Sequence, residues 1–331
     1  MNLLAPVNDP KLISEFADAG VDEFYMGFHD GEWTRTFGEY ADINRMSGFG
    51  RVANSCSFED LEKVAVAVRN RGKRLYVTLN ANCYDASQLD YIASNYCPDM
   101  RRMGIAGVIC SDMPTAKLMI DSGLAVTVST MAGVYNQYIA REYANLGIRR
   151  IILPRDLTIE EIKSVVTAVP EVEYEVFHMR NGCVFSDPFC LGFHRPDCGS
   201  TCSFVRHKDA RTFTTHRDFL QLDSMAFNDL MYNSLFHAYA CAMCAMYDFR
   251  AIGITSLKIV GRADDPRNVV SDVVLSARNR AIANGCSSRE EYLSKMVMSE
   301  LAPGLCRCGL SCYYPELRYG GGAVVPKLQR T

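Results

Sequence analysis

Residues 101–130 read RRMGIAGVICSDMPTAKLMIDSGLAVTVST, and this stretch decides the fold. It contains one phrase twice: a helix-like run, a glycine (Gly104, then Gly123) and a short apolar run. A glycine just past the last helical turn supplies the left-handed residue that ends many helices. A continuous apolar run after it is typical of a strand in a parallel sheet covered on both faces. The stretch therefore predicts alternating helices and strands.

The same phrase recurs along the chain, as FADAGVDEFYMGF (16–28), RNRGKRLYVTLN (69–80), YANLGIRRIILPRD (143–156) and FRAIGITSLKIVGR (249–262). The helices between the strands have start signals, among them Ser57, Asp85, and Thr158 with Glu161 in a capping box. The predicted strands are Leu3–Val7, Glu23–Phe28, Arg74–Asn80, Gly107–Ser111, Ala125–Ser129, Ile148–Pro154, Glu173–His178 and Ser256–Val260. Eight strands in strict alternation with helices predict an α/β fold, a TIM-barrel-like (β/α)8 barrel.

The alternative is a doubly wound open sheet, which for dinucleotides carries a G-x-G-x-x-G turn after the first strand. Here that strand ends in Ala5-Pro6-Val7-Asn8, without such a turn. We therefore expect a closed barrel domain over residues 1–295. An irregular cysteine-rich insert, 179–255, lies between strands seven and eight, and an irregular tail follows over 296–331. Loops after barrel strands emerge at the C-terminal face, where barrel active sites lie.

Composition limits the class of protein. The chain has 331 residues, 48% of them hydrophobic and 22% charged, which is enough for a large core. A net charge of −3 gives no global basic field for nucleic acid, although a local patch is compatible with it. The start of the chain does not read as a signal peptide, and no apolar run has the roughly 20 residues that a membrane helix needs. We expect a cytoplasmic protein with no membrane segment.

Fourteen cysteines make thiol chemistry the main functional signal. In a reducing cytosol they are not disulfides by default, and soft thiolates select zinc, copper(I) or iron–sulfur clusters. Six of them gather in one region: Cys183, Cys190, Cys198, Cys202, Cys241 and Cys244. The gaps of six residues between Cys183 and Cys190 and of three between Cys198 and Cys202 are looser than the CxxC pairs of a zinc ribbon. Cys241 and Cys244 do form a CxxC. A C-x3-C-x2-C radical-SAM signature fails, because its third position is Val205.

The spacing favours an iron–sulfur cluster, with zinc or free thiols as alternatives. We predict a [4Fe-4S] cluster held by four of the six, since such clusters are usually bound by four thiolates. Cys241 and Cys244 also fit a buried helix. The scattered cysteines are expected to be structural: Cys56, Cys83, Cys97, Cys110 and Cys286. The last three, Cys306, Cys308 and Cys312, form either a second small site or part of a labile tail.

Other catalytic motifs are absent: the chain has no HExxH, no GxSxG and no P-loop. The remaining candidates are polar residues at the predicted strand ends, which are Asn80, Ser111, Asp112, Ser129, Arg155, Glu175, His178, Lys258 and Arg262. They fit either a substrate pocket or structural ion pairs.

Three segments carry a resemblance to a known family: ILPRDL (152–157), EYEVFHMRNGCVFSDPFC (173–190) and SLKIVGRADDPRNVV (256–270). In this order, with LLAPV (3–7) at the start, they resemble peptidase family U32, the collagenase-like peptidases. Glu175, Phe177, Cys183 and Cys190 fit the family signature, and Cys198, Cys202 and Cys241 are similar to its later cysteines. The chain departs from the family at 179–181 and 188–189, next to the presumed site, so the substrate does not carry over.

The resemblance implies two activities. Some members are reported as peptidases; others carry a [4Fe-4S] cluster on these cysteines and take part in oxygen-independent hydroxylation of ubiquinone precursors or RNA bases. The thiols favour the second, with a small acidic or aromatic substrate or an RNA base, and with a family member as a possible heterodimer partner. A peptidase and a non-catalytic scaffold with a structural metal are the alternatives. The expected pocket residues are Glu175, His178, Lys258, Arg155 and Arg262.

Side-chain alternation refines the pocket. Glu175 and Phe177 share one face of their strand, and His178 lies on the other. An inward Glu175 between Arg155 and Lys258 would leave one positive charge uncompensated, which is costly in a buried site unless an anion binds. We therefore predict an acidic ligand at the barrel mouth. The alternative is neutralisation by a protein carboxylate, from Asp112, Asp156 or Asp264.

Overall fold

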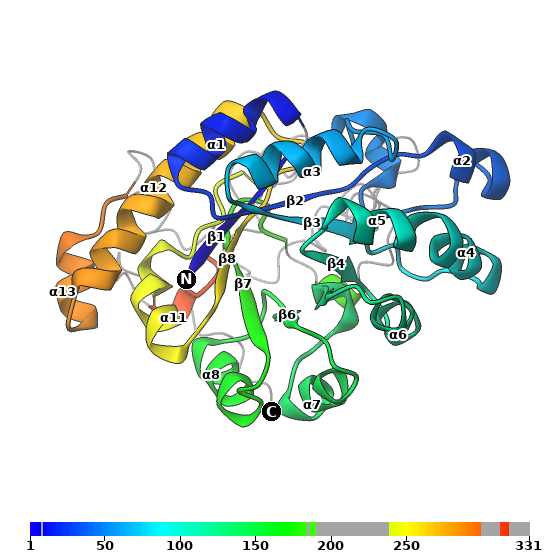
Figure 1. Ribbon diagram of the computed structural model, residues 1–331. Helices are drawn as coiled ribbons and strands as arrows, with labels where there is room; N and C mark the ends of the chain where they lie inside the picture. The colour runs from blue at the N-terminus through cyan, green and yellow to red at the C-terminus, as the bar shows by residue number, and fades with distance from the viewer. Residues whose placement is uncertain (8, 184–185, 190–237, 299–311, 318–331) are drawn as a thin grey trace, which may run out of the picture.

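The computed structural model describes residues 1–7, 9–183, 186–189, 238–298 and 312–317. Its centre is a closed barrel of eight parallel strands in chain order, β1 to β8, with β8 paired to β1 (Figure 1). The strands are β1 (Asn2–Pro6), β2 (Glu23–Met26), β3 (Arg74–Leu79), β4 (Gly107–Cys110), β5 (Val126–Val128), β6 (Arg150–Ile152), β7 (Glu173–Met179) and β8 (Ser256–Ile259). The predicted (β/α)8 barrel is confirmed.

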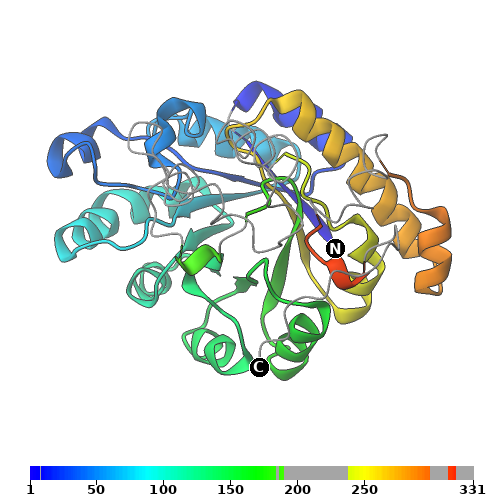
Figure 2. The ribbon, with the colours of Figure 1, turned by 180° about the vertical axis from the view of Figure 1, so that it is seen from behind.

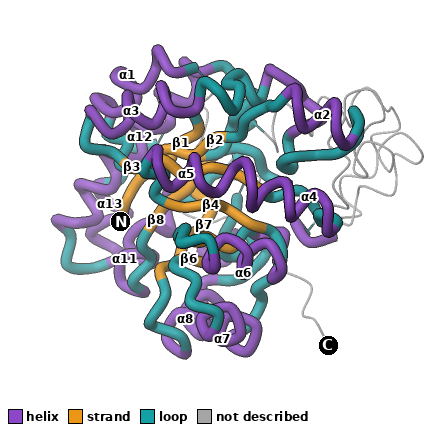
Figure 3. Tube along the Cα trace, turned by 45° about the vertical axis from the view of Figure 1, so that its right-hand side comes forward, coloured by secondary structure: helices purple, strands orange, loops and turns teal. Residues whose placement is uncertain are grey.

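Helices surround the strands as an outer ring, which Figures 1 and 3 show from two directions. Their start signals work as the sequence predicts: the Asp85 and Thr158 side chains both complete capping boxes. The helices are α1 (Ile13–Ala19), α2 (Gly31–Phe37), α3 (Leu61–Asn70), α4 (Ala86–Tyr91), α5 (Cys97–Met103), α6 (Met113–Asp121), α7 (Gln137–Asn145), α8 (Ile159–Ala168), α11 (Met246–Ile252), α12 (Pro266–Gly285) and α13 (Arg289–Lys295). No described helix combines the length and the apolar composition that a membrane crossing requires.

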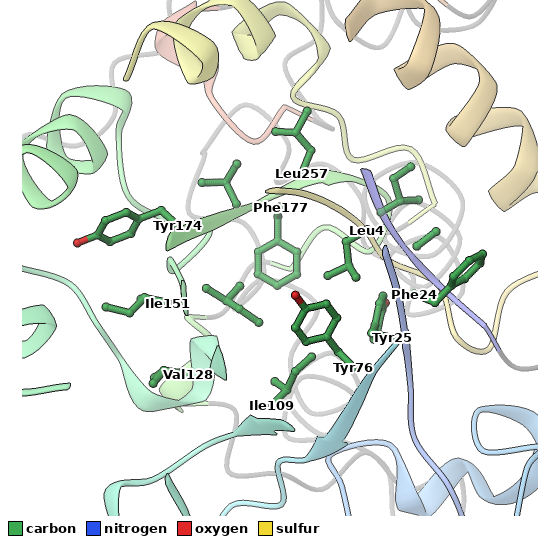
Figure 4. Close-up of a cluster of buried hydrophobic side chains, with 14 of the residues drawn as sticks. Leu4, Phe24, Tyr25, Tyr76, Ile109, Val128, Ile151, Tyr174, Phe177 and Leu257 are labelled. Atoms are coloured by element: carbon green, nitrogen blue, oxygen red, sulfur yellow. The ribbon is translucent and has the colours of Figure 1, made fainter. Parts of the chain in front are cut away.

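Alternation along each strand separates two buried layers. Phe177, Tyr76 and Tyr25 gather inside the ring of strands, whereas Phe24 and Tyr174 point outward to the helices (Figure 4). Both sets are almost fully buried. The interior is therefore a packed core, and any ligand space has to lie above it, at an end of the barrel.

The chain between β7 and β8 contains the predicted insert, and its last described part is α11 in the outer ring. The described part of the predicted tail, residues 312–317, packs on the barrel beside α11 (Figure 2). Tyr314 is buried and its ring meets that of Phe249 edge-on, with centroids 5.1 Å apart. The Glu316 side chain accepts the backbone N–H of Ile159 at 3.0 Å, where α8 begins. This segment is thus an integral part of the folded barrel.

Candidate functional site at the barrel mouth

A cavity of about 370 Å³ opens where the strands end. Its walls come from the carboxyl-terminal parts of β2 to β4 and β6 to β8 and from the loops that follow several strands, β5 among them, which is where barrel enzymes bind substrates. The lining residues are Tyr25, Arg45, Met46, Phe49, Thr78, Asn80, Ile109, Ser129, Thr130, Ile152, Arg155, Phe177, Asn181, Gly182, Cys183, Lys258, Val260, Arg262, Ala263 and Asp264. A cavity of this size suits a small molecule or a single nucleobase.

Four cations line the cavity, and two of them hold a carboxylate from the insert. Arg45 donates to Asp187 at 2.7 Å, and Arg155 donates to the same carboxylate at 2.9 and 3.1 Å. Burial alone would raise the pKa of Asp187, but the two arginines hold it well below its usual range. Arg155 also donates to the Asn181 carbonyl and lies 4.2 Å above the Phe177 ring. The start of the insert is thereby fixed across the mouth.

Lys258 and Arg262 form the other cationic wall. Lys258 Nζ donates to Glu175 at 2.8 Å and lies 4.2 Å from the centre of the Tyr25 ring. Arg262 donates to oxygens of Thr78 at 3.1 Å and Asn44 at 3.2 Å. Burial lowers the pKa of both cations, that of Arg262 to about 10. Their charged forms would be stabilised by an anion in the cavity.

The predicted charge arrangement is correct for Lys258 and wrong for Arg155. Glu175 does bond Lys258, but its second partner is Arg150, at 3.2 Å. Arg155 is instead neutralised by Asp187, which is none of the three carboxylates proposed from the sequence. Arg155 follows β6 by three residues, so it lies above the layer in which Glu175 is buried.

Two polar groups at the cavity are satisfied by no described residue. The Tyr25 hydroxyl is buried without a hydrogen-bond partner, in a side chain of 3% exposure, and so is the Asn181 amide oxygen. Burial raises the pKa of Tyr25, which keeps its hydroxyl protonated and able to donate. Asn181 and its neighbour Arg180 also have left-handed backbone (φ 51° and 65°), a costly conformation that clusters at functional sites. A bound ligand would satisfy both groups.

Below the cavity lies a buried network of ion pairs around Arg150 that was not predicted from the sequence. Arg150 donates to both carboxylate oxygens of Glu23, at 2.8 and 2.9 Å, as well as to Glu175 and Glu173. Burial would lower the pKa of Arg150, but the Glu23 hydrogen bonds and the charge of Glu175 raise it above its usual value. Charged residues within predicted strands are the signal that could have identified this network.

His178 does not line the cavity, contrary to the sequence-based expectation. It lies at the register shift of β7 between Phe177 and Met179, and it is fully buried. Neither ring nitrogen has a hydrogen-bond partner among the described residues. Burial lowers the pKa of His178 to about 3, so the ring is neutral near pH 7. Its position indicates a packing role.

We expect His178 to make the fold acid-sensitive. Its folded pKa lies below its unfolded value, so only the unfolded chain gains a proton between about pH 6.5 and pH 3. Stability is therefore lost as the pH falls, by about 2 kcal/mol between pH 7 and pH 5 from this group. In His178→Leu this part of the pH dependence should disappear, measured by urea unfolding at both pH values. An identical loss in the variant and the wild type would contradict this role.

One described thiol lines the cavity, and two others lie in segments bridged to the end of β7 and to each other. Cys183 lines it, while Cys241 forms a β-bridge with Met179, at the end of β7, and another with Cys312. The Cys241 sulfur accepts the backbone N–H of Met243 at 3.3 Å, the kind of hydrogen bond that supports metal-bound thiolates. Thiolate donors of this kind fit a metal ion or an iron–sulfur cluster by their chemistry.

The structure describes only three of the six predicted cysteine ligands. Cys190, Cys198 and Cys202 lie outside the described residues, as do Cys306 and Cys308. Within the described ranges no group of three or more His, Cys, Asp or Glu side chains is arranged to hold a metal ion. Cys244 is buried in the turn Met243–Ala245. The [4Fe-4S] cluster therefore stays a prediction.

Comparison with known proteins places the chain in a family. A collagenase of Porphyromonas gingivalis is 23% identical over 163 residues, covering 49% of this chain and 35% of that protein. A 23S rRNA 5-hydroxycytidine synthase of Escherichia coli is 24% identical over 313 residues, covering 88% of this chain and 42% of that protein. The chain thus spans less than half the length of these relatives. The structure of the U32 peptidase Mk0906 superposes with a TM-score of 0.47 and 12% identity, over 79% of this chain and 93% of that one. The family model for Peptidase family U32 matches residues 9–315, and the chain belongs to that family.

Proposed function

We propose that this protein is an iron–sulfur-dependent enzyme that takes part in oxygen-independent hydroxylation of an aromatic or nucleobase substrate. One observation carries the proposal: Cys183, in the cysteine-rich segment, lines a cavity that also holds cationic and aromatic side chains. A redox centre on these thiols would adjoin the space in which a substrate binds. The relative named as a 23S rRNA hydroxycytidine synthase supports a nucleobase as the substrate class.

The side chains of the cavity have separable roles in this proposal. Lys258 and Arg262 would bind an acidic group, such as a carboxylate or a phosphate. Phe177, Phe49 and Tyr25 offer aromatic surface to a planar ring, and the Tyr25 hydroxyl would donate a hydrogen bond to it. The cluster would supply one-electron redox chemistry next to the bound ring.

A peptidase is the second function that the family allows, and the collagenase relative is an example. A serine or cysteine peptidase needs a nucleophile within hydrogen-bond reach of a base. Of the described histidines, His29 contacts the Asn54 carbonyl at 2.9 Å, and His178 contacts no polar group. No contact of the described residues favours this alternative over the proposed modification.

Anaerobic purification with iron, acid-labile sulfide and zinc assays tests the proposal first. We expect about four iron and four sulfide per chain, as for one [4Fe-4S] cluster. Cys183→Ser should lose them, whereas Cys97→Ser, a buried cysteine of α5 remote in sequence from the insert, should keep them. Stoichiometric zinc without iron would indicate a structural zinc site instead.

Substrate class needs a separate assay. RNA from cells that lack this protein should be missing a hydroxylated base, which mass spectrometry of digested RNA would detect, and the wild-type gene but not the Cys183→Ser gene should restore it. If the cells that lack this protein retained every modified base, RNA would be excluded as the substrate, and a small aromatic acid would remain. Cleavage of gelatin without a reductant, retained after loss of the cluster, would support the peptidase.

A further inference from the structure

The described C-terminal segment meets the thiol region at one point. Cys241 is the middle residue of a small three-stranded arrangement, antiparallel to Met179 on one side and parallel to Cys312 on the other. Backbone hydrogen bonds hold it in place: Ala242 N–H to the His178 carbonyl at 2.8 Å, and Tyr313 N–H to the Cys241 carbonyl at 3.0 Å. Cys312 is thus in register with Cys241, although the two are far apart in sequence.

Contacts that involve no thiol fix this register. The Tyr313 ring stacks on Phe177 with centroids 6.1 Å apart, and its hydroxyl donates to the Arg180 carbonyl. The next residue, Tyr314, is buried against α11. The packing of Tyr313 and Tyr314 therefore holds Cys312 beside Cys241.

The register has a chemical consequence. Paired residues of neighbouring strands lie about 4.8 Å apart and project to the same face. Two thiolates at this spacing are within the reach of one metal ion or cluster, in which metal–sulfur bonds are about 2.3 Å long.

We propose that Cys312 donates a thiolate to the same site as Cys241, so that the C-terminal segment completes the metal site at the barrel mouth. This inference rests on the proposed thiolate site. It adds a ligand to the six cysteines identified from the sequence, and it assigns Cys312 to the main site rather than to a second one. Metal binding at such a site would depend on residues 312–317, which follow α13 in the sequence.

Metal content of a Cys312→Ser variant tests the inference. After anaerobic purification we expect iron per chain below about one-fifth of the wild-type value, because a lost ligand costs more than the 10- to 100-fold of a supporting contact. Cys97→Ser is the matched control, since Cys97 is buried in α5 and its thiol contacts the Met119 sulfur at 3.8 Å. Circular dichroism and the thermal midpoint verify that each variant is folded.

Alkylation of the wild-type protein supplies a readout that needs no variant. Iodoacetamide with peptide mass spectrometry should leave Cys312 and Cys241 unmodified in the metal-loaded protein and label both after chelation. Cys83 is exposed and should be labelled in both states. Equal labelling of Cys312 before and after chelation would overturn the inference even if Cys312→Ser failed to fold.

The outcomes separate this inference from the proposed function. Unchanged iron in a folded Cys312→Ser overturns the role of Cys312 and leaves the iron–sulfur enzyme standing. Zinc without iron in the wild type, lost in Cys312→Ser, overturns the iron–sulfur function and retains Cys312 as a ligand. A wild-type protein that binds neither metal overturns both.

Discussion

Replacing Arg150 by methionine is expected to destabilise the protein by about 3–5 kcal/mol, the cost of removing one partner from a buried ion pair. Methionine fills a similar volume but removes the side chain that, within the described part of the chain, bonds both Glu23 and Glu175. Both carboxylates are fully buried and would lose their shared cation. Urea unfolding at pH 7 measures the difference, because the midpoint shifts while the slope stays constant.

The adjacent arginine is the matched control. Arg149 is 46% exposed and pairs with Glu173 at the surface, so Arg149→Met should cost about 0–1 kcal/mol. Arg150→Lys keeps the charge but loses the paired hydrogen bonds to Glu23, and it should fall between the two. If Arg150→Met were no less stable than Arg149→Met, the network would not be a determinant of stability.

The barrel was predictable because its signals are local. Gly20, Gly104 and Gly253 each end a helix in the left-handed conformation, and a strand follows each of them. The predicted strands mostly extend one or two residues too far, as at 148–154, where β6 is Arg150–Ile152. The apolar pattern continues beyond the sheet ladder because residues just past it still pack at the mouth.

Partners distant in sequence were not predictable. Arg149 and Arg150 are adjacent, and alternation says that they face opposite sides without saying which one enters the barrel. Glu23 lies 127 residues from its partner Arg150. The Asp187 carboxylate likewise joins Arg45, in the loop after α2, and Arg155, in the loop after β6. Sequence periodicity shows which residues share a face of a strand. Which distant side chains meet there is determined by how the barrel closes.

Lys258→Met is expected to weaken the binding of acidic ligands at the barrel mouth by about 10- to 100-fold, since a hydrogen bond to a charged group contributes about 1.5–3 kcal/mol. Calorimetry would compare 4-hydroxybenzoate with 4-hydroxybenzamide, and uridine monophosphate with uridine. Each neutral analogue should bind the variant and the wild type within about threefold of one another, because it gains no charge-assisted bond. Lys295→Met, at a lysine of 56% exposure, controls for net charge.

The pH dependence distinguishes an anion site from a structural pair. Burial lowers the pKa of Lys258, and an acidic ligand favours the protonated form, so ligand binding should be accompanied by proton uptake as the pH approaches that lowered value. A lysine that served only to neutralise Glu175 would give no such coupling. Unchanged affinity for both acids in a folded Lys258→Met protein would show that the cavity binds its ligands without this charge. The aromatic walls and the Tyr25 hydroxyl would then determine what the cavity accepts.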